Sequence, residues 1–292
     1  MAKYLGFETI VDHAYDASQI SASEYPIEVA GIVTSLGLHA GHFIQDIMSQ
    51  YGQIRPWIYL ASVKDINTRT SSAMPQKQNP ILLTETRREI SSTLALAMGP
   101  TMRAHNITPG MQDPKEESSN TEMVMAAVDF INRMDRILKA LVVDPDRARE
   151  ELNSDWTASQ ELADVLMRKY QIPFRIGHNF SGSLVRFAKQ RNYSPNNFPY
   201  VEAQRIFAET IKSHGADLAL PLTEREFRDD LDPIKIINAR ATHGGLQPSE
   251  MNRMLGQAKK DIEDQKRWVE MRRKVIDQAL RGLNDDFRRF LR

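Results

Sequence analysis

Apolar residues recur at helical spacing along almost the whole chain, and no stretch shows the period-two alternation that is typical of a half-buried strand. Prolines, glycines and polar loops then mark where helices start and stop. They predict long helices over residues 26–48, 80–98 and 121–143. Broad apolar faces on helices of this length are typical of a bundle in which each helix contacts more than one neighbour. We therefore expect an all-α protein that begins with a bundle of long helices.

The pattern changes after Pro145 to shorter helices that are separated by frequent loops. Thr223 and Glu226 have the spacing of a capping box, in which each side chain satisfies a backbone N–H at a helix start. The last stretch, 249–283, alternates Lys and Arg with Asp and Glu, which favours a solvated helix face over a coiled coil or a nucleic-acid surface. We predict two domains: a long-helix domain over residues 1–143, and a smaller helical domain over residues 144–292.

Three glycines, Gly31, Gly37 and Gly41, lie inside the first predicted helix. Each costs about 1 kcal/mol relative to alanine in a helix interior. Close approach of a neighbouring helix would explain them, and so would simple tolerance. The sequence leaves both explanations open.

The overall composition disfavours several classes of protein. The chain has 292 residues, and its 38 Lys and Arg balance 38 Asp and Glu, so the formal net charge of zero gives no attraction to nucleic acid or anionic lipid. The absence of cysteine excludes disulfides, thiolate metal sites and cysteine nucleophiles. We find neither the layout of a signal peptide nor a run of about 18 apolar residues. These features predict a cytoplasmic protein without membrane or nucleic-acid partners.

The segment 68–80, TRTSSAMPQKQNP, is the part of the chain whose composition indicates chemistry. Its small hydroxyl residues let successive backbone amides form a cradle for an anion, while Lys77 and Asn79 add a charge and an amide donor. A serine in such surroundings can have its alkoxide stabilised enough to act as a base or a nucleophile. The alternative is a polar connector with one exposed lysine, and the local chemistry alone leaves that alternative open.

The stretch SSAMPQKQNP resembles the signature loop of the fumarase/aspartase/argininosuccinate lyase superfamily, Gly-Ser-Ser-x-Met-Pro-x-Lys-x-Asn-Pro, at every fixed position except the leading glycine. Similarity to argininosuccinate lyase extends to LGFETIVDHAYDAS upstream, and downstream to GMQDPKE, ELADVLMRKYQIPFRIGHNFSGSLV and LDPIKIINARATHGGLQPSE. The resemblance therefore covers nearly the whole chain. It implies the all-α long-helix fold of that superfamily and a carbon–nitrogen lyase that releases fumarate from an N-substituted aspartate.

The resemblance also implies roles for individual residues. Ser71 corresponds to the serine base that removes the proton next to a carboxylate, and the loop around it would stabilise the charge that develops there. Gln112 and Lys115 correspond to a Gln and a Lys that lie close to the substrate, although an exposed polar loop is the alternative for this pair. No metal ion and no organic cofactor is needed. The implied substrate-binding set is Thr70, Ser72, Met74, Lys77, Asn79, Gln112 and Lys115.

Some positions depart from the family pattern. Thr70 replaces the leading glycine, which removes backbone freedom from a loop that moves during catalysis. Ser23 stands where the family has arginine, and His105-Asn106 replaces a Tyr-Asn pair, so contacts outside the fumarate half of the substrate are expected to differ. The identity of the amine that leaves is therefore open.

The largest departure concerns the other active-site segments. Family members carry a Thr-His stretch and a Thr-x-x-His-x-Gln stretch, both of which would precede Met1, and the three segments meet from three subunits of a tetramer. We therefore expect a tetrameric core in a hetero-oligomer, with a separate polypeptide that supplies the missing segments. The seven histidines do not replace them. His39 and His42 lie at i and i+3 without a third metal ligand, and His178 and His243 fall in motifs that indicate a structural role.

Two other classes of function remain open. The first is a non-catalytic protein, either a truncated or degenerate pseudoenzyme or a structural protein like the family's lens crystallins, and it predicts no effect of Ser71→Ala. A helical module that regulates a full-length lyase predicts association with that lyase. The joint presence of Ser71, Lys77 and Asn79 favours catalysis, since a loop without chemistry does not need these residue types together.

Overall fold

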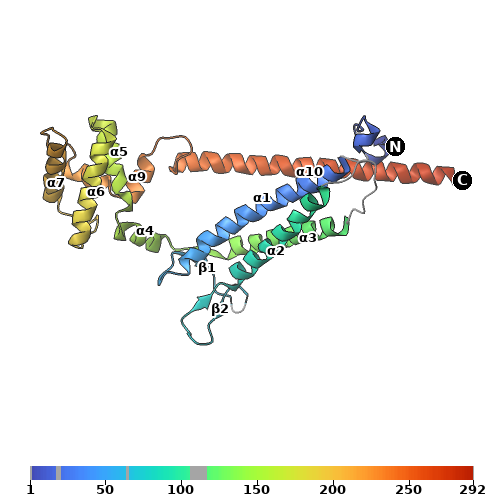
Figure 1. The fold of residues 1–292 in the computed structure, drawn as a ribbon, viewed down its shortest axis with the longest axis horizontal. Coiled ribbons are helices and arrows are strands. Elements are labelled where there is room, and N and C mark those ends of the chain that lie inside the picture. The colour runs from blue at the N-terminus through green and yellow to red at the C-terminus, as the bar shows by residue number, and fades with distance from the viewer. Residues whose placement is uncertain (1, 18–20, 64–65, 106–116, 292) are drawn as a thin grey trace. The chain divides into compact units, whose positions relative to one another are not determined.

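The computed structural model describes residues 2–17, 21–63, 66–105 and 117–291. The chain divides into two compact units, Met1–Asp144 and Pro145–Arg292, and each unit is described by itself. Helices form most of both units (Figure 1), so the all-α fold class expected from the sequence is confirmed.

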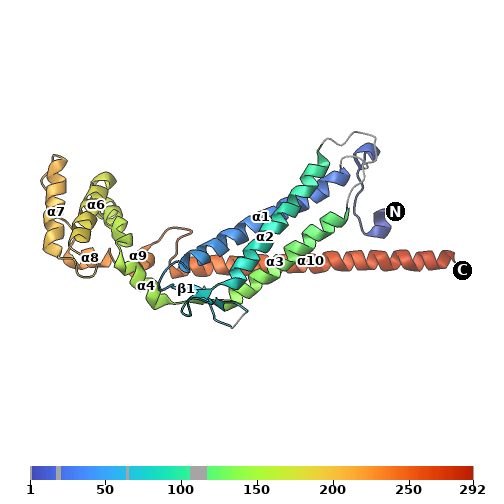
Figure 2. The ribbon, with the colours of Figure 1, turned by 60° about the horizontal axis from the view of Figure 1, so that its bottom comes forward.

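Long helices form the body of the first unit. After a short 3-10 helix, Ala2–Leu5, helices α1 (Ser21–Gln50), α2 (Ile81–Ala104) and α3 (Glu117–Ala140) follow, and they lie side by side in both views (Figures 1 and 2). Helix α2 packs along both α1 and α3. The buried positions recur at helical spacing, so each helix turns one apolar stripe toward the others. This core includes Val33, Ile44, Ile47, Leu83, Ile90, Met123, Phe130 and Ile137.

Several helix ends differ from the expected positions. The helix expected over 121–143 covers Glu117–Ala140, and Leu141–Val143 form a strand instead. Helix α1 begins at Ser21, so Pro26 lies inside it rather than in its first turn. Helix α2 continues through Gly99-Pro100 to Ala104, although a proline removes one backbone hydrogen bond from a helix interior. Pro100 is buried, and the Arg103 guanidinium donates to Asn120 Oδ1 of α3 at 2.6 Å. Packing beyond the proline therefore offsets the lost hydrogen bond.

Only Gly37 among the three glycines of α1 is explained by a close neighbour. A Cβ atom built there would come within 3.0 Å of the Leu94 side chain and 3.4 Å of the Ile90 side chain on α2. Gly31 and Gly41 would meet nothing within 4 Å. Close helix approach therefore accounts for Gly37, and the other two positions have no contact that requires glycine.

Short antiparallel strands connect the long helices. Strand β1 (Ile58–Leu60) pairs with β4 (Leu141–Val143), with Ile58 opposite Val143, and strand β2 (Arg69–Thr70) pairs with β3 (Gln78–Asn79). No strands were expected from the sequence. Strands of two or three residues are too short to show the alternation by which a strand is recognised.

Helix α1 passes a test of length and composition for a membrane span, over Glu24–Gln50 with a mean hydropathy of 1.3 in its most apolar window. No run of about 18 apolar residues was found in the sequence. The helix still reaches this mean hydropathy because the residues between its apolar side chains are mostly small and neutral, and they lower the mean only slightly. Val33, Ile44 and Ile47 of the same helix are buried against its neighbours. Because a core helix also passes this test, one such helix is weak support for a membrane span.

The second unit contains shorter helices followed by one very long helix. The left-handed backbone of Gln171, with φ of 59°, ends one helix, and the next helix begins directly after Pro173. The elements are α4 (Pro145–Ser154), the 3-10 helix η3 (Thr157–Ser159), α5 (Gln160–Tyr170), α6 (Phe174–Gln190), α7 (Tyr200–Ser213), α8 (Glu224–Asp229), α9 (Pro233–Ala239) and α10 (Pro248–Phe290).

Aromatic side chains fill the core of the second unit. Phe198 is fully buried and meets the Trp156 ring edge-on, with ring centroids 5.4 Å apart. Phe180 and Phe207 form a similar pair at 5.2 Å, which joins α6 to α7. The predicted capping box is confirmed at α8, because Thr223 and Glu226 each accept a hydrogen bond from the other's backbone N–H.

Helix α10 is 43 residues long and has no buried residue in the part of the chain that the structure describes. This exposure agrees with the expected solvated helix, but one face of α10 is apolar. Its side chains recur every seven residues, a repeat that was not among the features predicted from the sequence. The repeat consists of Leu255, Ile262, Val269, Ile276, Leu283 and Phe290.

Candidate active site

The predicted signature loop belongs to the first unit, and the paired strands β2 and β3 form its base. Thr70 lies opposite Gln78 in this ladder. Directly beyond it, the Ser71 N–H donates to the Lys77 carbonyl at 2.9 Å, and the Lys77 N–H donates to the Met74 carbonyl at 2.9 Å. The residues between Ser71 and Lys77 therefore form a tight turn at the end of a two-stranded stem.

The hydroxyl group of Ser71 accepts hydrogen bonds from the turn's own backbone. The amide N–H of Ala73 lies 3.3 Å from Ser71 Oγ, and the amide N–H of Met74 lies 3.2 Å from it. Two donors that point at one oxygen favour its ionised form, and such bonds shorten when the acceptor becomes charged. The turn thus places two donors that would stabilise an ionised Ser71 Oγ.

The base of the stem is fixed to the helices. Asn67 is buried, and its side-chain amide donates to the Ala61 carbonyl at 3.0 Å, while its own carbonyl accepts the Leu82 N–H of α2 at 3.2 Å. The hydroxyls of Thr68 and Ser62 lie 3.1 Å apart in hydrogen-bond contact. A buried, hydrogen-bonded base with an exposed tip is typical of loops that carry function on a rigid scaffold.

The other predicted residues of the loop lie at the surface. Ser72, Met74 and Lys77 are exposed, and Ser71 and Asn79 are half-buried. Within the described residues, no ion pair or hydrogen bond engages the Lys77 ammonium group. The ammonium group is therefore accessible to a carboxylate ligand.

Thr70, the departure from the family's glycine, makes a contact that a glycine could not make. Its Oγ1 accepts a hydrogen bond from the Gln78 side-chain amide at 3.2 Å, across the β2–β3 ladder. Both side chains are exposed. The threonine therefore adds a side-chain link to the stem of the loop.

Several predicted residues are not placed. Gln112 and Lys115 lie outside the described residues, so their predicted contacts with a substrate remain predictions. The side chain of Ser23 is also outside the description.

The histidines are spread over both units. His39 and His42 are exposed on α1, and His39 Nδ1 lies 2.7 Å from the Ser35 carbonyl. His243 lies 3.1 Å from the Glu250 carboxylate. Across the residues placed by the structure, no group of three or more His, Cys, Asp or Glu side chains is arranged to hold a metal ion.

A polar pocket lies between α6 and α7, and the sequence did not predict it. Its only advance signal is the spacing of Asn179, Gly182, Ser183 and Arg186, which places them on one face of α6. Of its lining, only His178 was considered, and it was assigned a structural role.

Comparisons with known proteins agree with the signature loop. Residues 156–238 match the family model for the argininosuccinate lyase C-terminal region. The argininosuccinate lyase of Methanosarcina acetivorans is 27% identical in an alignment 293 positions long, which covers 96% of this chain and 54% of that protein. The argininosuccinate lyase of Archaeoglobus fulgidus is 25% identical in an alignment 297 positions long, which covers 98% of this chain and 56% of that protein. The chain thus spans about half the length of the curated relatives it matches.

Solved structures show the same fold. A variant of EDDS lyase with bound fumarate superimposes with a TM-score of 0.82 at 18% identity, over 99% of this chain and 56% of that chain. EDDS lyase in complex with formate gives a TM-score of 0.81, also at 18% identity. By sequence and by fold, the chain is therefore related to the C-terminal part of the argininosuccinate lyase-like proteins of the fumarase/aspartase superfamily.

Proposed function

We propose that this chain is a subunit of a carbon–nitrogen lyase that eliminates an amine or a similar group from an N-substituted aspartate and releases fumarate. The observation that carries the proposal is the pair of amide N–H groups, from Ala73 and Met74, that point at Ser71 Oγ. The similarity to argininosuccinate lyases and the fumarate bound in a structural relative support the same reaction class.

In the proposed reaction, Ser71 removes a proton from the carbon next to a substrate carboxylate. The electrons of the broken C–H bond form the C=C bond of fumarate, and the C–N bond breaks toward nitrogen, which takes a proton from an acid on another segment. Negative charge develops on the carboxylate that neighbours the reacting carbon. Lys77, Asn79 and the loop amides around Ser72 and Met74 stabilise that charge, with Thr70 at the edge of the carboxylate site.

Gln112 and Lys115 belong to the same proposed substrate site. They follow α2 in the sequence, as the corresponding pair follows the signature loop in the family that this chain resembles. We assign them to the part of the substrate that leaves. This assignment rests on the resemblance of GMQDPKE alone.

The proposed enzyme is assembled from several chains, with a tetrameric core and a separate polypeptide that supplies the remaining active-site segments. Exposed apolar side chains on long helices support an assembly, because such surface is rarely left in water on this scale. Ile32 and Leu36 on α1 are exposed, as are Val128 and Ile131 on α3. We place the assembly in the cytoplasm, on the cysteine-free composition.

The first test is whether this chain has a partner. Native mass spectrometry of the chain, co-expressed with the reading frames that flank its gene, would detect a stable complex with a second chain carrying the Thr-x-x-His-x-Gln segment. A chain that forms only homo-oligomers or monomers would contradict the separate-polypeptide proposal and favour the non-catalytic class. Association with a full-length lyase would instead favour the regulatory class.

The second test is catalytic and concerns Ser71. We expect Ser71→Ala to lower kcat for fumarate release from N-substituted aspartates by at least about 100-fold, because general-base catalysis contributes roughly that much or more. Fumarate release is followed by ultraviolet absorbance. Ser91→Ala is the matched control, since Ser91 is an exposed α2 residue whose hydroxyl bonds only to the Arg87 carbonyl of its own helix. Equal rates for the two variants would rule out Ser71 as the base.

A further inference from the structure

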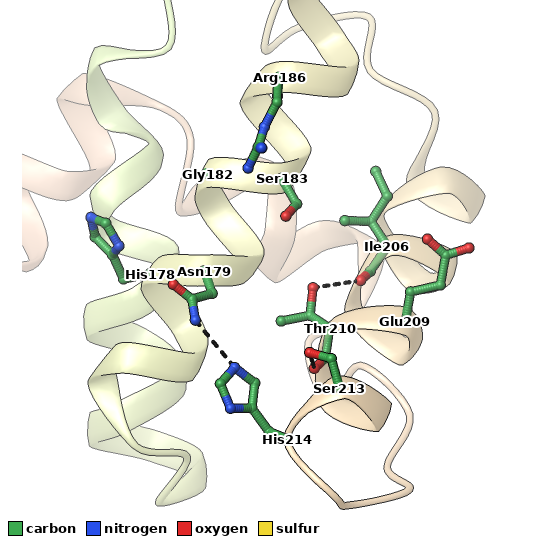
Figure 3. A pocket seen from close by; sticks show the side chains of 10 residues that line it. All are labelled: His178, Asn179, Gly182, Ser183, Arg186, Ile206, Glu209, Thr210, Ser213 and His214. Carbon is green, nitrogen blue, oxygen red and sulfur yellow. Dashed lines mark hydrogen bonds between the residues drawn. The ribbon is translucent and has the colours of Figure 1, made fainter.

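The polar pocket between α6 and α7 lies in the second unit and contains none of the signature-loop residues. It has a volume of about 480 Å³, which is within the range of small-molecule sites. Figure 3 shows that α6 contributes Asn179, Gly182 and Arg186 to one wall, and that α7 faces them across the gap. The α6–α7 pocket is thus a site candidate separate from the proposed catalytic loop.

The absence of a side chain at Gly182 leaves open space on the α6 side of the pocket. A Cβ atom built at this residue would meet nothing within 4 Å, so the space beside it is open. Glycine in a helix interior costs about 1 kcal/mol relative to alanine, and here no packed neighbour requires it. Gly177, one and a half turns earlier, has a contact that requires glycine, because a Cβ there would lie 2.8 Å from the Ala163 backbone. The open space is therefore the feature that distinguishes Gly182.

The charged side chains that line the α6–α7 pocket are Arg186 and Glu209, and their formal charges cancel. Glu209 is the acidic residue among the lining side chains, and its carboxylate accepts a hydrogen bond from the Arg205 guanidinium at 2.6 Å. Arg186 has no ion pair within the described residues, and in Figure 3 its guanidinium reaches back over Gly182. The guanidinium group presents several N–H donors in a geometry that matches a carboxylate or a phosphate.

Neutral hydrogen-bonding groups lie at the other end of the pocket. The Asn179 side-chain amide and His214 Nε2 are 3.1 Å apart and join α6 to α7 (Figure 3). The hydroxyls of Thr210 and Ser213 donate to carbonyls of their own helix, at 2.8 and 2.7 Å, so only their acceptor capacity remains for a ligand. A ligand that bridges the pocket would therefore meet a cation at one end and groups of mixed donor and acceptor character at the other.

We propose that the α6–α7 pocket binds a small oxyanion, with a carboxylate or phosphate group held by Arg186 above the open backbone of Gly182. The ligand lies between α6 and α7 and contacts Asn179 and His214 with its remaining polar atoms. Such a ligand links the two helices and lowers the mobility of the polypeptide around them.

The test is hydrogen–deuterium exchange of the full chain, with and without inorganic phosphate or fumarate at millimolar concentration. We expect slower exchange in peptides covering residues 178–186 and 206–214. Arg186→Gln is expected to weaken binding by about tenfold or more, since a charged hydrogen bond contributes roughly 1.5 to 3 kcal/mol. Arg175→Gln is the matched control, because Arg175 is an exposed residue of the same helix outside the pocket. Equal affinity of the two variants would overturn the proposal.

Gly182 gives a second, steric test. Gly182→Met is expected to fill the open space and abolish protection by the anion, while Gly182→Ala retains it, and thermal unfolding shows whether both variants are folded. Protection that survives in folded Gly182→Met would contradict the proposed position of the ligand.

Fumarate also suits the proposed loop site, so Lys77→Gln separates the two sites. If Lys77→Gln loses fumarate protection at residues 71–79 but keeps it in the peptides covering residues 178–186 and 206–214, fumarate binds the two sites independently.

Discussion

Single side chains determine how the candidate loop presents its serine. Two amide donors reach Ser71 Oγ from within the turn, and the Thr70–Gln78 side-chain contact lies directly below it. The turn therefore orients the serine through its own backbone, and the stem limits how far the turn can move. A glycine at position 70 would give the backbone more freedom and remove the side-chain link.

Replacing Thr70 tests this restriction directly. We expect Thr70→Gly to raise the rate of amide hydrogen exchange at Ser71 and Lys77 about fivefold, because loss of a hydrogen bond worth about 1 kcal/mol shifts the opening equilibrium by that factor. The rates are measured by NMR. Thr70→Ser keeps the hydroxyl and should exchange at the original rates. Indistinguishable rates in all three chains would mean that the contact does not hold the stem.

Asp230 is the residue whose ionisation opposes folding most clearly. Burial raises its pKa from 3.8 to about 6, and nearby Glu161, Glu226 and Asp229 add to the rise, while Lys169 lowers it. Among the described residues, its Oδ2 atom is buried without a hydrogen-bond partner. The folded state therefore binds a proton at Asp230 more tightly than the unfolded state does, so stability falls as the pH rises through this interval and stays lower above it.

Asp230→Asn removes the pH-dependent contribution of this carboxyl group to the stability of the fold. We expect the variant to be more stable than the original chain at neutral pH by about 1 kcal/mol, a value reduced for solvent screening of a half-exposed group, and to show no gain below a pH of about 4. Urea unfolding across that pH range measures the difference. Asp217→Asn, at an exposed loop position, controls for the change in net charge. A gain that is the same at every pH would refute the role of Asp230 ionisation.

At the scale of elements, α6 contains two glycines that serve opposite purposes. Gly177 lets α6 approach the backbone of α5 at Ala163, and Gly182 faces open space. The same substitution should therefore have opposite effects at the two positions. We expect Gly177→Ala to destabilise the fold by about 1 to 3 kcal/mol through overpacking, and Gly182→Ala to stabilise it by up to about 1 kcal/mol. Thermal unfolding of both variants measures this, and a shared sign would contradict the packing difference.

The sequence predicts elements better than it predicts what joins them. Helical periodicity identified the long helices, and Thr223 with Glu226 identified the start of α8, because both signals are local. The passage of α2 through Pro100 was not predictable, since it depends on burial and on a contact with α3. In the same way, the residue types of the loop indicated a serine base, but the two amides that reach Ser71 Oγ depend on the fold of the turn.

At the scale of the whole molecule, α10 presents an apolar face that no described residue buries. We expect this face to contribute to the proposed assembly of several chains. Ile276→Asp should weaken self-association by more than about tenfold, because burial of an isoleucine side chain contributes roughly 2 kcal/mol and a charge would oppose it. Sedimentation velocity measures the distribution of species. Gln278→Asp lies away from the repeat and should leave the distribution unchanged, and the same outcome for Ile276→Asp would exclude this face from the interface.

The seven-residue repeat of α10 also limits which changes in length the helix tolerates. Deleting seven residues from its middle would shorten it by about 10 Å but would return every later apolar side chain to within about 20° of its earlier angular position. Deleting a single residue would turn all later side chains by about 100° and divide the apolar face in two. The six positions of the repeat contain no polar residue that would distinguish one register from the next. Natural variants of this protein should therefore differ in the length of α10 by whole multiples of seven.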